Sequence, residues 1–91
     1  MYSLSQNYPN PFNPRTRIQM EIPKSGHVRL ALYDVLGREV AVLVNDRREA
    51  GTYSVEADAS HLASGIYFYR MQVVPEGSVF FSATKKMVVL K

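Results

Sequence analysis

Apolar and polar residues alternate one for one in several short segments, and this is the strongest constraint on the fold. Residues 17–22 place isoleucine or methionine at every second position, and residues 27–32 do the same with valine and leucine. Successive side chains of a β-strand point to opposite faces, so a period of two is typical of strands with one buried face. No window carries the 3.6-residue apolar stripe of a helix. The sequence therefore predicts an all-β chain.

Turn signals divide the alternating segments at regular intervals. We expect turns at Pro23–Gly26, Asp34–Arg38, Ser60–Gly65 and Pro75–Ser78, and a charged loop over Asn45–Gly51. The strands expected between them cover residues 17–22, 27–33, 39–44, 53–58, 66–74 and 79–90, the last as one strand or a pair. About seven short strands at this spacing are typical of an immunoglobulin-like antiparallel β-sandwich.

Residues 1–15 have a different composition from the rest of the 91-residue chain. Three prolines alternate with asparagines around Tyr8 and Phe12. Proline fixes its own φ and pushes the preceding residue toward extended geometry. We expect an extended strap over residues 1–15, held to the body of the domain by the rings of Tyr8 and Phe12. The sandwich itself then covers residues 16–91.

Two local patterns sharpen the sandwich prediction. Tyr67 lies early in the penultimate strand, two residues before Tyr69, which is the spacing of a tyrosine corner. The Tyr67 hydroxyl would donate to a backbone group a few residues upstream, while Tyr69 or Phe68 would fill the centre that a disulfide occupies in other sandwiches. Gly37 is free to adopt a positive φ in the second turn, and the same property is expected of Gly65.

The residues that carry chemistry are sparse and scattered. The chain has no cysteine, which excludes disulfides, thiolate metal sites and a thiol nucleophile. His27 and His61 lack metal-ligand spacing, and Glu56 and Asp58 on one strand face have nothing gathered around them. We therefore predict no enzyme activity, no metal and no cofactor. The net charge of +3 comes from cations spread along the whole chain, so no nucleic-acid partner is expected.

The last segment, Thr84–Lys91, is apolar on both faces. Met87 and Val89 face one way, and Val88 and Leu90 face the other. Such a strand is either buried in the middle of the sandwich or offers its outer face to a partner. The edge of such a strand can also pair with the edge of a second copy. The flanking lysines are poor core residues and favour an address that a receptor reads.

Four ordered motifs, covering nearly the whole chain from Leu4 to Lys91, carry a family resemblance. They are Ser3–Pro14, Leu32–Val40, Leu62–Arg70 and Lys85–Lys91, with Gly51–Thr52–Tyr53 between the second and the third. The chain resembles the type A C-terminal sorting domain of the type IX (Por) secretion system of the Bacteroidetes. It also resembles the small immunoglobulin-like module of flagellar hook-capping proteins.

The resemblance implies a non-catalytic signal that directs a larger cargo protein, attached on the N-terminal side, across the outer membrane. The implied partners are the outer-membrane secretion machinery and a surface sortase. The implied location is the periplasm in transit, then the cell surface or the medium. Position by position, the sorting motif falls on Lys85, Lys86, Met87 and Lys91. The strap motif falls on Pro9, Asn10 and Pro11, and the corner motif on Gly65 and Tyr67; we expect these two to serve folding.

An alternative is a structural or adhesive immunoglobulin-like appendage of a secreted glycoside hydrolase, which contacts cells or carbohydrate. It would need a flat row of exposed aromatic rings. The candidates are Tyr2, Tyr8, Tyr33 and Tyr53, since the chain has no tryptophan.

Overall fold

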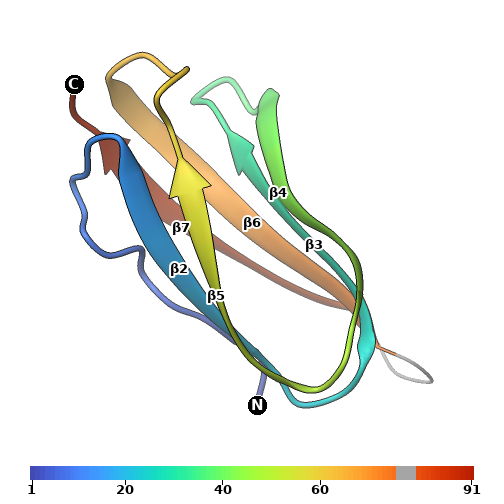
Figure 1. The fold of residues 1–91 in the computed structure, drawn as a ribbon. Helices are drawn as coiled ribbons and strands as arrows, with labels where there is room; N and C mark the ends of the chain where they lie inside the picture. Colours follow the sequence, from blue (N-terminus) through green and yellow to red (C-terminus); the bar gives the residue numbers. More distant parts are fainter. Residues whose placement is uncertain (76–79) are drawn as a thin grey trace.

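The computed structural model describes residues 1–75 and 80–91 of the chain. In these residues seven strands form two antiparallel sheets that pack face to face (Figure 1). The strands are β1 (Ser3–Leu4), β2 (Arg15–Ile22), β3 (Gly26–Tyr33), β4 (Glu39–Arg48), β5 (Gly51–Asp58), β6 (Gly65–Pro75) and β7 (Phe81–Val89). The sandwich is elongated, with extents of 42 × 23 × 17 Å.

The strand order confirms the predicted all-β immunoglobulin-like sandwich. One sheet has the order β1-β2-β5, and the other has the order β4-β3-β6-β7. The chain therefore crosses between the sheets after β2, β4 and β5, as in Greek-key sandwiches. β3 and β6 are the central strands of the larger sheet, whereas β7 lies at its edge.

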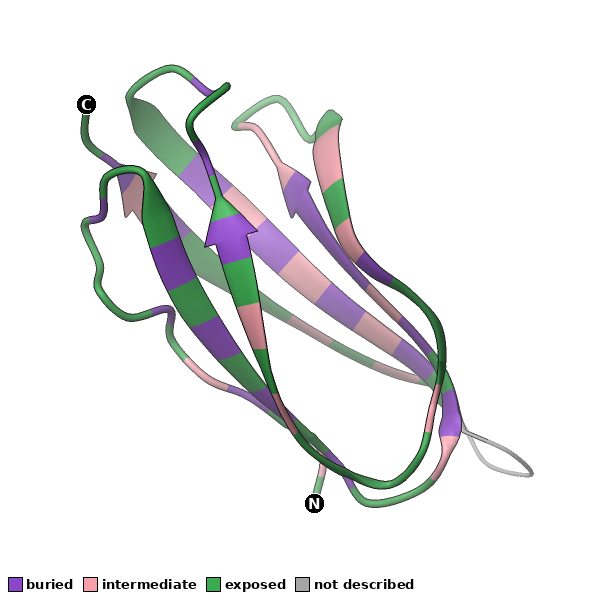
Figure 2. Ribbon diagram, in the orientation of Figure 1, coloured by how far each residue is buried: buried purple, intermediate pink, exposed green. Residues whose placement is uncertain are grey.

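The core follows the predicted alternation. Every second residue of β2 is buried, from Thr16 to Ile22, and Figure 2 shows the alternating bands along this strand and along β6. β3 contributes Val28, Leu30 and Leu32 to the same layer. Tyr69 of β6 is fully buried at the centre and fills the volume predicted for it. The free energy of folding thus comes mainly from apolar side chains enclosed between the two sheets.

The expected charged loop over Asn45–Gly51 is wrong. β4 continues through Arg48, and only residues 49–50 separate it from β5. The extra residues pair with β3, with Arg47 opposite His27 and Arg48 opposite Gly26. β4 is an edge strand, so its charged side chains reach water while its backbone still pairs. The predicted turn at Pro75–Ser78 lies outside the described residues from Glu76 onward.

The strap is not the continuous extended segment that we expected. Before β2 begins at Arg15, only Ser3–Leu4 is strand, and the chain bends at residues 9–11 and 13–14. The ring of Phe12 is buried, as predicted. The ring of Tyr8 is 82% exposed, so its predicted anchoring role is wrong. The backbone of Tyr8 makes the attachment instead, because its N–H and C=O bond to Arg17 at 2.9 and 3.0 Å.

A small buried polar network fixes the bend of the strap against the first sheet. The Asn7 side-chain amide donates to the Pro9 carbonyl at 3.0 Å and to the Thr16 hydroxyl at 3.1 Å. That hydroxyl donates to the same Pro9 carbonyl at 2.8 Å. From the second sheet, the Tyr69 hydroxyl donates to the Ser5 carbonyl at 2.6 Å. The strap is therefore hydrogen-bonded to both sheets.

Replacing Thr16 with valine should destabilise the domain. The substitution keeps the shape of the side chain and removes the hydroxyl, which leaves the buried Asn7 amide and the Pro9 carbonyl short of one partner each. We expect the free energy of unfolding to fall by about 1–3 kcal/mol. Urea unfolding measures this, with Thr52→Val on the exposed side of β5 as the matched control. Equal effects of the two substitutions would contradict a structural role for the network.

Candidate functional site

The residues that the sequence singled out gather mainly at one end of the sandwich. The end of β7, the start of β6 and the turn between β3 and β4 lie together there, close to the C-terminus (Figure 1). The N-terminus lies at the opposite end of the long axis. We call the end of the sandwich that holds the C-terminus the C-terminal end.

β7 places its sorting-motif residues in different environments. Met87 and Val89 are fully buried, so their side chains are part of the core. Lys85 and Lys86 are exposed. Lys85 lies two residues before Met87 and therefore on the same, inward face of β7. Its side chain still reaches solvent because β7 is an edge strand. An inward-pointing charge on an edge strand also discourages pairing with another chain.

Lys91 follows β7 and is held at both ends of the residue. Its backbone N–H donates to the Ser64 hydroxyl at 3.0 Å. Its ammonium group donates to the Ser60 carbonyl at 2.6 Å. The exposed lysine is thus attached to the loop between β5 and β6.

The strap lies along the outer edge of the last part of β7. The Val88 N–H donates to the Asn10 side-chain carbonyl at 2.9 Å. The Phe12 N–H donates to the Val88 carbonyl at 3.1 Å, and the Leu90 N–H donates to the Phe12 carbonyl at 3.0 Å. Upstream, the Gln6 amide donates to the Lys86 carbonyl at 2.7 Å. Pro9 and Pro11 flank Asn10 and are themselves exposed.

The tyrosine corner is present as predicted. The Tyr67 hydroxyl donates to the Ala63 carbonyl at 2.8 Å, four residues upstream, and its ring is buried. This bond closes the chain between the Ser60–Ser64 loop and β6. Gly65 has a φ of 153° at the start of the strand. Tyr67 and Gly65 thereby set the path of the loop that holds Lys91.

The turn at Asp34–Arg38 is rigid. Gly37 has a φ of 82°, in the left-handed region that favours glycine, as predicted. The Asp34 carboxylate accepts from the N–H groups of Leu36 and Arg38 at 2.9 and 3.0 Å, and from the Arg38 guanidinium at 2.8 Å. The backbone N–H of Arg38 is the main reason why the pKa of Asp34 is lowered.

The outermost residues of this turn are apolar, which sequence analysis missed. Val35 is 66% exposed and Leu36 is 74% exposed. Tight turns favour glycine, asparagine, aspartate, serine and proline at such positions. The contrast with turn preferences was visible in the sequence, because Val35 and Leu36 lie between the turn-forming Asp34 and Gly37.

The charges at the C-terminal end do not balance. Three carboxylates at this end form ion pairs: Asp34 with Arg38, Glu39 with Arg29, and Asp58 with Arg15. Glu56, two residues before Asp58, is exposed and forms no ion pair within the described residues. In residues 1–75 and 80–91, no ion pair involves Lys85, Lys86 or Lys91. The described residues also contain no group of three histidine or carboxylate side chains that could hold a metal ion.

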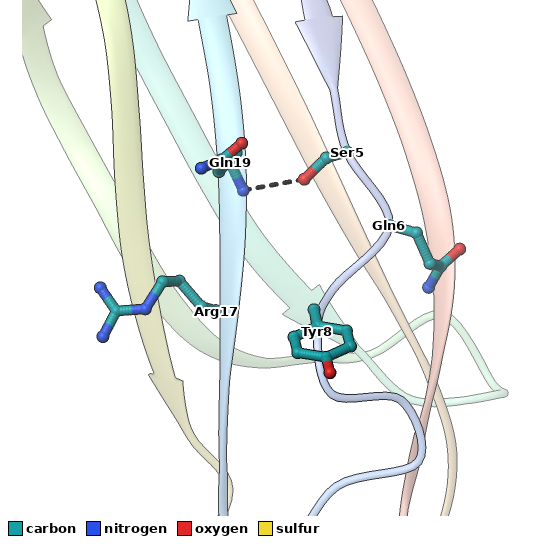
Figure 3. Close-up of a pocket in the computed structure, with 5 residues that line it drawn as sticks. All are labelled: Ser5, Gln6, Tyr8, Arg17 and Gln19. Atoms are coloured by element: carbon teal, nitrogen blue, oxygen red, sulfur yellow. Dashed lines mark hydrogen bonds between the residues drawn. The ribbon is translucent and has the colours of Figure 1, made fainter.

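A groove of about 370 Å³ lies beside the strap on the outer face of the smaller sheet (Figure 3). Ser5, Gln6, Tyr8, Arg17 and Gln19 line it, and Ser5 Oγ accepts from the Gln19 N–H at 2.9 Å. Tyr8 is the one exposed ring of the four tyrosines considered for carbohydrate contact.

The other three tyrosines of that set are half-buried, each against a different neighbour. Tyr2 stacks on Phe81, whereas arginines cover the rings of Tyr33 and Tyr53. The expected flat aromatic row is therefore wrong, because these rings are used for internal packing.

Comparison with known proteins agrees with the family resemblance. A family model described as the secretion system C-terminal sorting domain matches residues 6–89. Two solved chains match the structure at a significant level. One is the crystal structure of CopC from Methylosinus trichosporium OB3b, with a TM-score of 0.59, 13% identity, and coverage of 98% of this chain and 93% of that chain. At that identity the likeness concerns the fold alone.

A comparison with curated proteins finds no significant match. A search of the described residues for a helix of sufficient length and hydropathy to span a bilayer also returned none.

The buried hydroxyl of Tyr69 predicts a stability loss at alkaline pH. Burial raises its pKa from the ordinary value of 10.0 to about 12. Between these values the unfolded chain releases a proton that the folded chain keeps, so the unfolded state is favoured as pH rises. The free energy of unfolding should fall by up to about 1.4 kcal/mol per pH unit in this window.

Urea unfolding across this alkaline window measures the slope, with Tyr69→Phe as the matched variant. The variant is expected to be less stable at neutral pH and to show a shallower alkaline slope. Identical slopes in the two proteins would exclude Tyr69 as the origin of the pH dependence.

Proposed function

This chain belongs to the family of secretion system C-terminal sorting domains, and from that premise we propose which of its surfaces carries the signal. It is a type IX sorting domain, which is non-catalytic and targets the protein that carries it for secretion to the cell surface or the medium. Recognition by the secretion machinery and attachment to a cargo follow from this membership. The signal, we propose, is the set of exposed lysines Lys85, Lys86 and Lys91, which extends from the middle of β7 to the C-terminal end.

One observation carries this proposal: Lys85, Lys86 and Lys91 are exposed and form no ion pair within residues 1–75 and 80–91, whereas Asp34, Glu39 and Asp58 are each paired with an arginine. Exposed charged groups that lack an internal counter-charge are available to an acidic receptor and steer its approach. Lys86 projects from the outer face of β7, and Lys91 is held in place by Ser60 and Ser64. Met87 contributes indirectly, because its buried side chain packs in the core and positions the strand that carries the lysines.

The remaining motif residues support this surface. Pro9, Asn10 and Pro11 form the part of the strap that borders the end of β7. Gly65 and Tyr67 set the loop that holds Lys91, and Gly37 permits the neighbouring turn. On this proposal the strap, residues 1–15, and the sandwich, residues 16–91, are recognised as one folded unit.

The route follows from the family. The cargo joins on the N-terminal side, and the N-terminus lies at the end of the sandwich opposite the C-terminus, so a bulky cargo leaves Lys91 accessible (Figure 1). The domain is then read in the periplasm by the outer-membrane machinery and acted on by a surface sortase. An edge-to-edge dimer through Val88 and Leu90 would have to displace the strap, which already bonds to that edge.

Charge removal tests the proposed signal. Residues 2–91 are fused behind a periplasm-targeted fluorescent reporter in a bacterium that has the type IX machinery. We expect the intact fusion to leave the cell and Lys86→Gln/Lys91→Gln to lower the secreted fraction at least about fivefold, since loss of charged contacts weakens recognition. Fluorescence in the medium and on the cell surface is the readout.

Two comparisons separate recognition from folding. Lys24→Gln, in the exposed turn between β2 and β3 at the other end, should leave export unchanged. Deleting residues 85–91 is a weaker test, because it also removes the core residues Met87 and Val89. A folded Lys86→Gln/Lys91→Gln fusion that is exported at the normal yield would contradict the proposal.

A further inference from the structure

The turn at Asp34–Arg38 presents two bulky apolar side chains to water on a rigid frame. Val35 and Leu36 occupy the central positions of a β-turn in which the Gly37 N–H donates to the Asp34 carbonyl at 3.0 Å. The Asp34 carboxylate closes the turn with three further hydrogen bonds. The turn does not need apolar residues at its tip, and the exposure of apolar side chains to water is unfavourable in free energy. Contiguous exposed apolar surface of this kind marks interaction sites.

The turn is one wall of a groove of about 300 Å³. The opposite wall is formed by residues 64–67 at the start of β6, among which Ile66 is 45% exposed. Val88 of β7 lies directly opposite Ile66 in the sheet. The apolar strip thus runs from the turn across β6 to β7.

The rim of this strip is cationic. Lys86 lies two residues from Val88 on the same outer face of β7, and Lys91 is attached to Ser64 at the edge of the groove. Asp34 also lines the groove, but its carboxylate is paired with Arg38. The uncompensated charge around the strip is therefore positive.

We propose that Val35, Leu36 and Ile66 are the apolar anchor of a docking surface for a protein receptor whose own apolar contact is rimmed by carboxylates. This inference rests on the proposed function and deepens it, because it adds an anchor to the lysine signal. A few apolar anchors surrounded by a charged rim carry most of the energy of a protein interface. Three aliphatic side chains and two lysines suit a pocketed protein surface, where each anchor is enclosed, better than a lipid surface.

The reporter fusion tests the anchor with a matched control. Val35→Ser/Leu36→Ser keeps Asp34, Gly37 and both lysines, and it changes side chains that contribute little to the core. Val74→Ser/Phe80→Ser replaces two apolar residues of similar exposure, each 55%, at the other end of the larger sheet. We expect at least about a tenfold loss of secreted reporter for the first pair and no change for the second. Thermal unfolding of both purified domains confirms that each remains folded.

Competition identifies a protein receptor. The domain without reporter, overproduced in the periplasm, should lower export of the intact fusion, and the Val35→Ser/Leu36→Ser domain should not. Export of the turn variant at the normal level, or equal competition by the two domains, would overturn the inference. Turn-dependent binding of the purified domain to phosphatidylglycerol vesicles would overturn it in favour of a membrane surface.

Different outcomes would refute the proposed function and the apolar anchor. If the unmodified fusion stays in the cell, the proposed function is refuted, and so is the anchor. If that fusion is exported and Lys86→Gln/Lys91→Gln is defective while the turn variant is normal, the lysine signal stands and the anchor alone is refuted.

Discussion

The attachment of Phe12 to the end of β7 is the interaction on which the architecture of the C-terminal end depends. Its ring is buried in the core, and its backbone bonds to Val88 of β7 and to Leu90, which follows that strand. The same strap begins in the smaller sheet, where β1 pairs with β2. One segment of chain therefore ties both sheets together and covers the edge of the terminal strand. Backbone groups at a strand edge otherwise invite pairing with other chains.

The surface at this end combines a rigid frame with exposed chemistry. The Tyr67 corner holds the Ser60–Ser64 loop, and the Asp34 carboxylate holds the turn beside it. On these supports lie lysines that lack an internal counter-charge and apolar side chains that lack an internal partner. Exposed lysines are ordinary on protein surfaces, so it is the grouping of exposed apolar side chains beside them that indicates a binding surface. The N-terminus lies at the other end of the sandwich, far from the C-terminus (Figure 1).

Local patterns in the sequence predicted the features that depend on local rules. Alternation predicted β2 and β3, and the spacing of Tyr67 and Tyr69 predicted both the corner bond and the buried centre. Those features arise from side-chain period and turn chemistry, which a few neighbouring residues determine. The extension of β4 was missed because charged residues such as Arg47 resemble a loop, whereas an exposed edge strand accepts them.

The features that could not be predicted depend on contacts between distant parts of the chain. Asn10 bonds to Val88, which is 78 residues away, and nothing in either segment identifies the other. The exposure of Tyr8 has the same origin, because the path of the strap is determined by buried Asn7 and Thr16 and not by the aromatic rings. The exposure of Leu36 was open to prediction from turn preferences, yet its neighbour Ile66 is known only from the packing of β6 against the turn.

Amide hydrogen exchange at Val88 and Leu90 tests most directly whether the strap holds the terminal strand in place. The account predicts that both amides exchange slowly in the intact domain, and that Asn10→Ala speeds exchange at Val88 while amides of the central strand β3 remain protected. Exchange of Val88 and Leu90 in the intact domain at the rate of an unstructured peptide would contradict it, because the sorting surface would then have no fixed form before it meets its receptor.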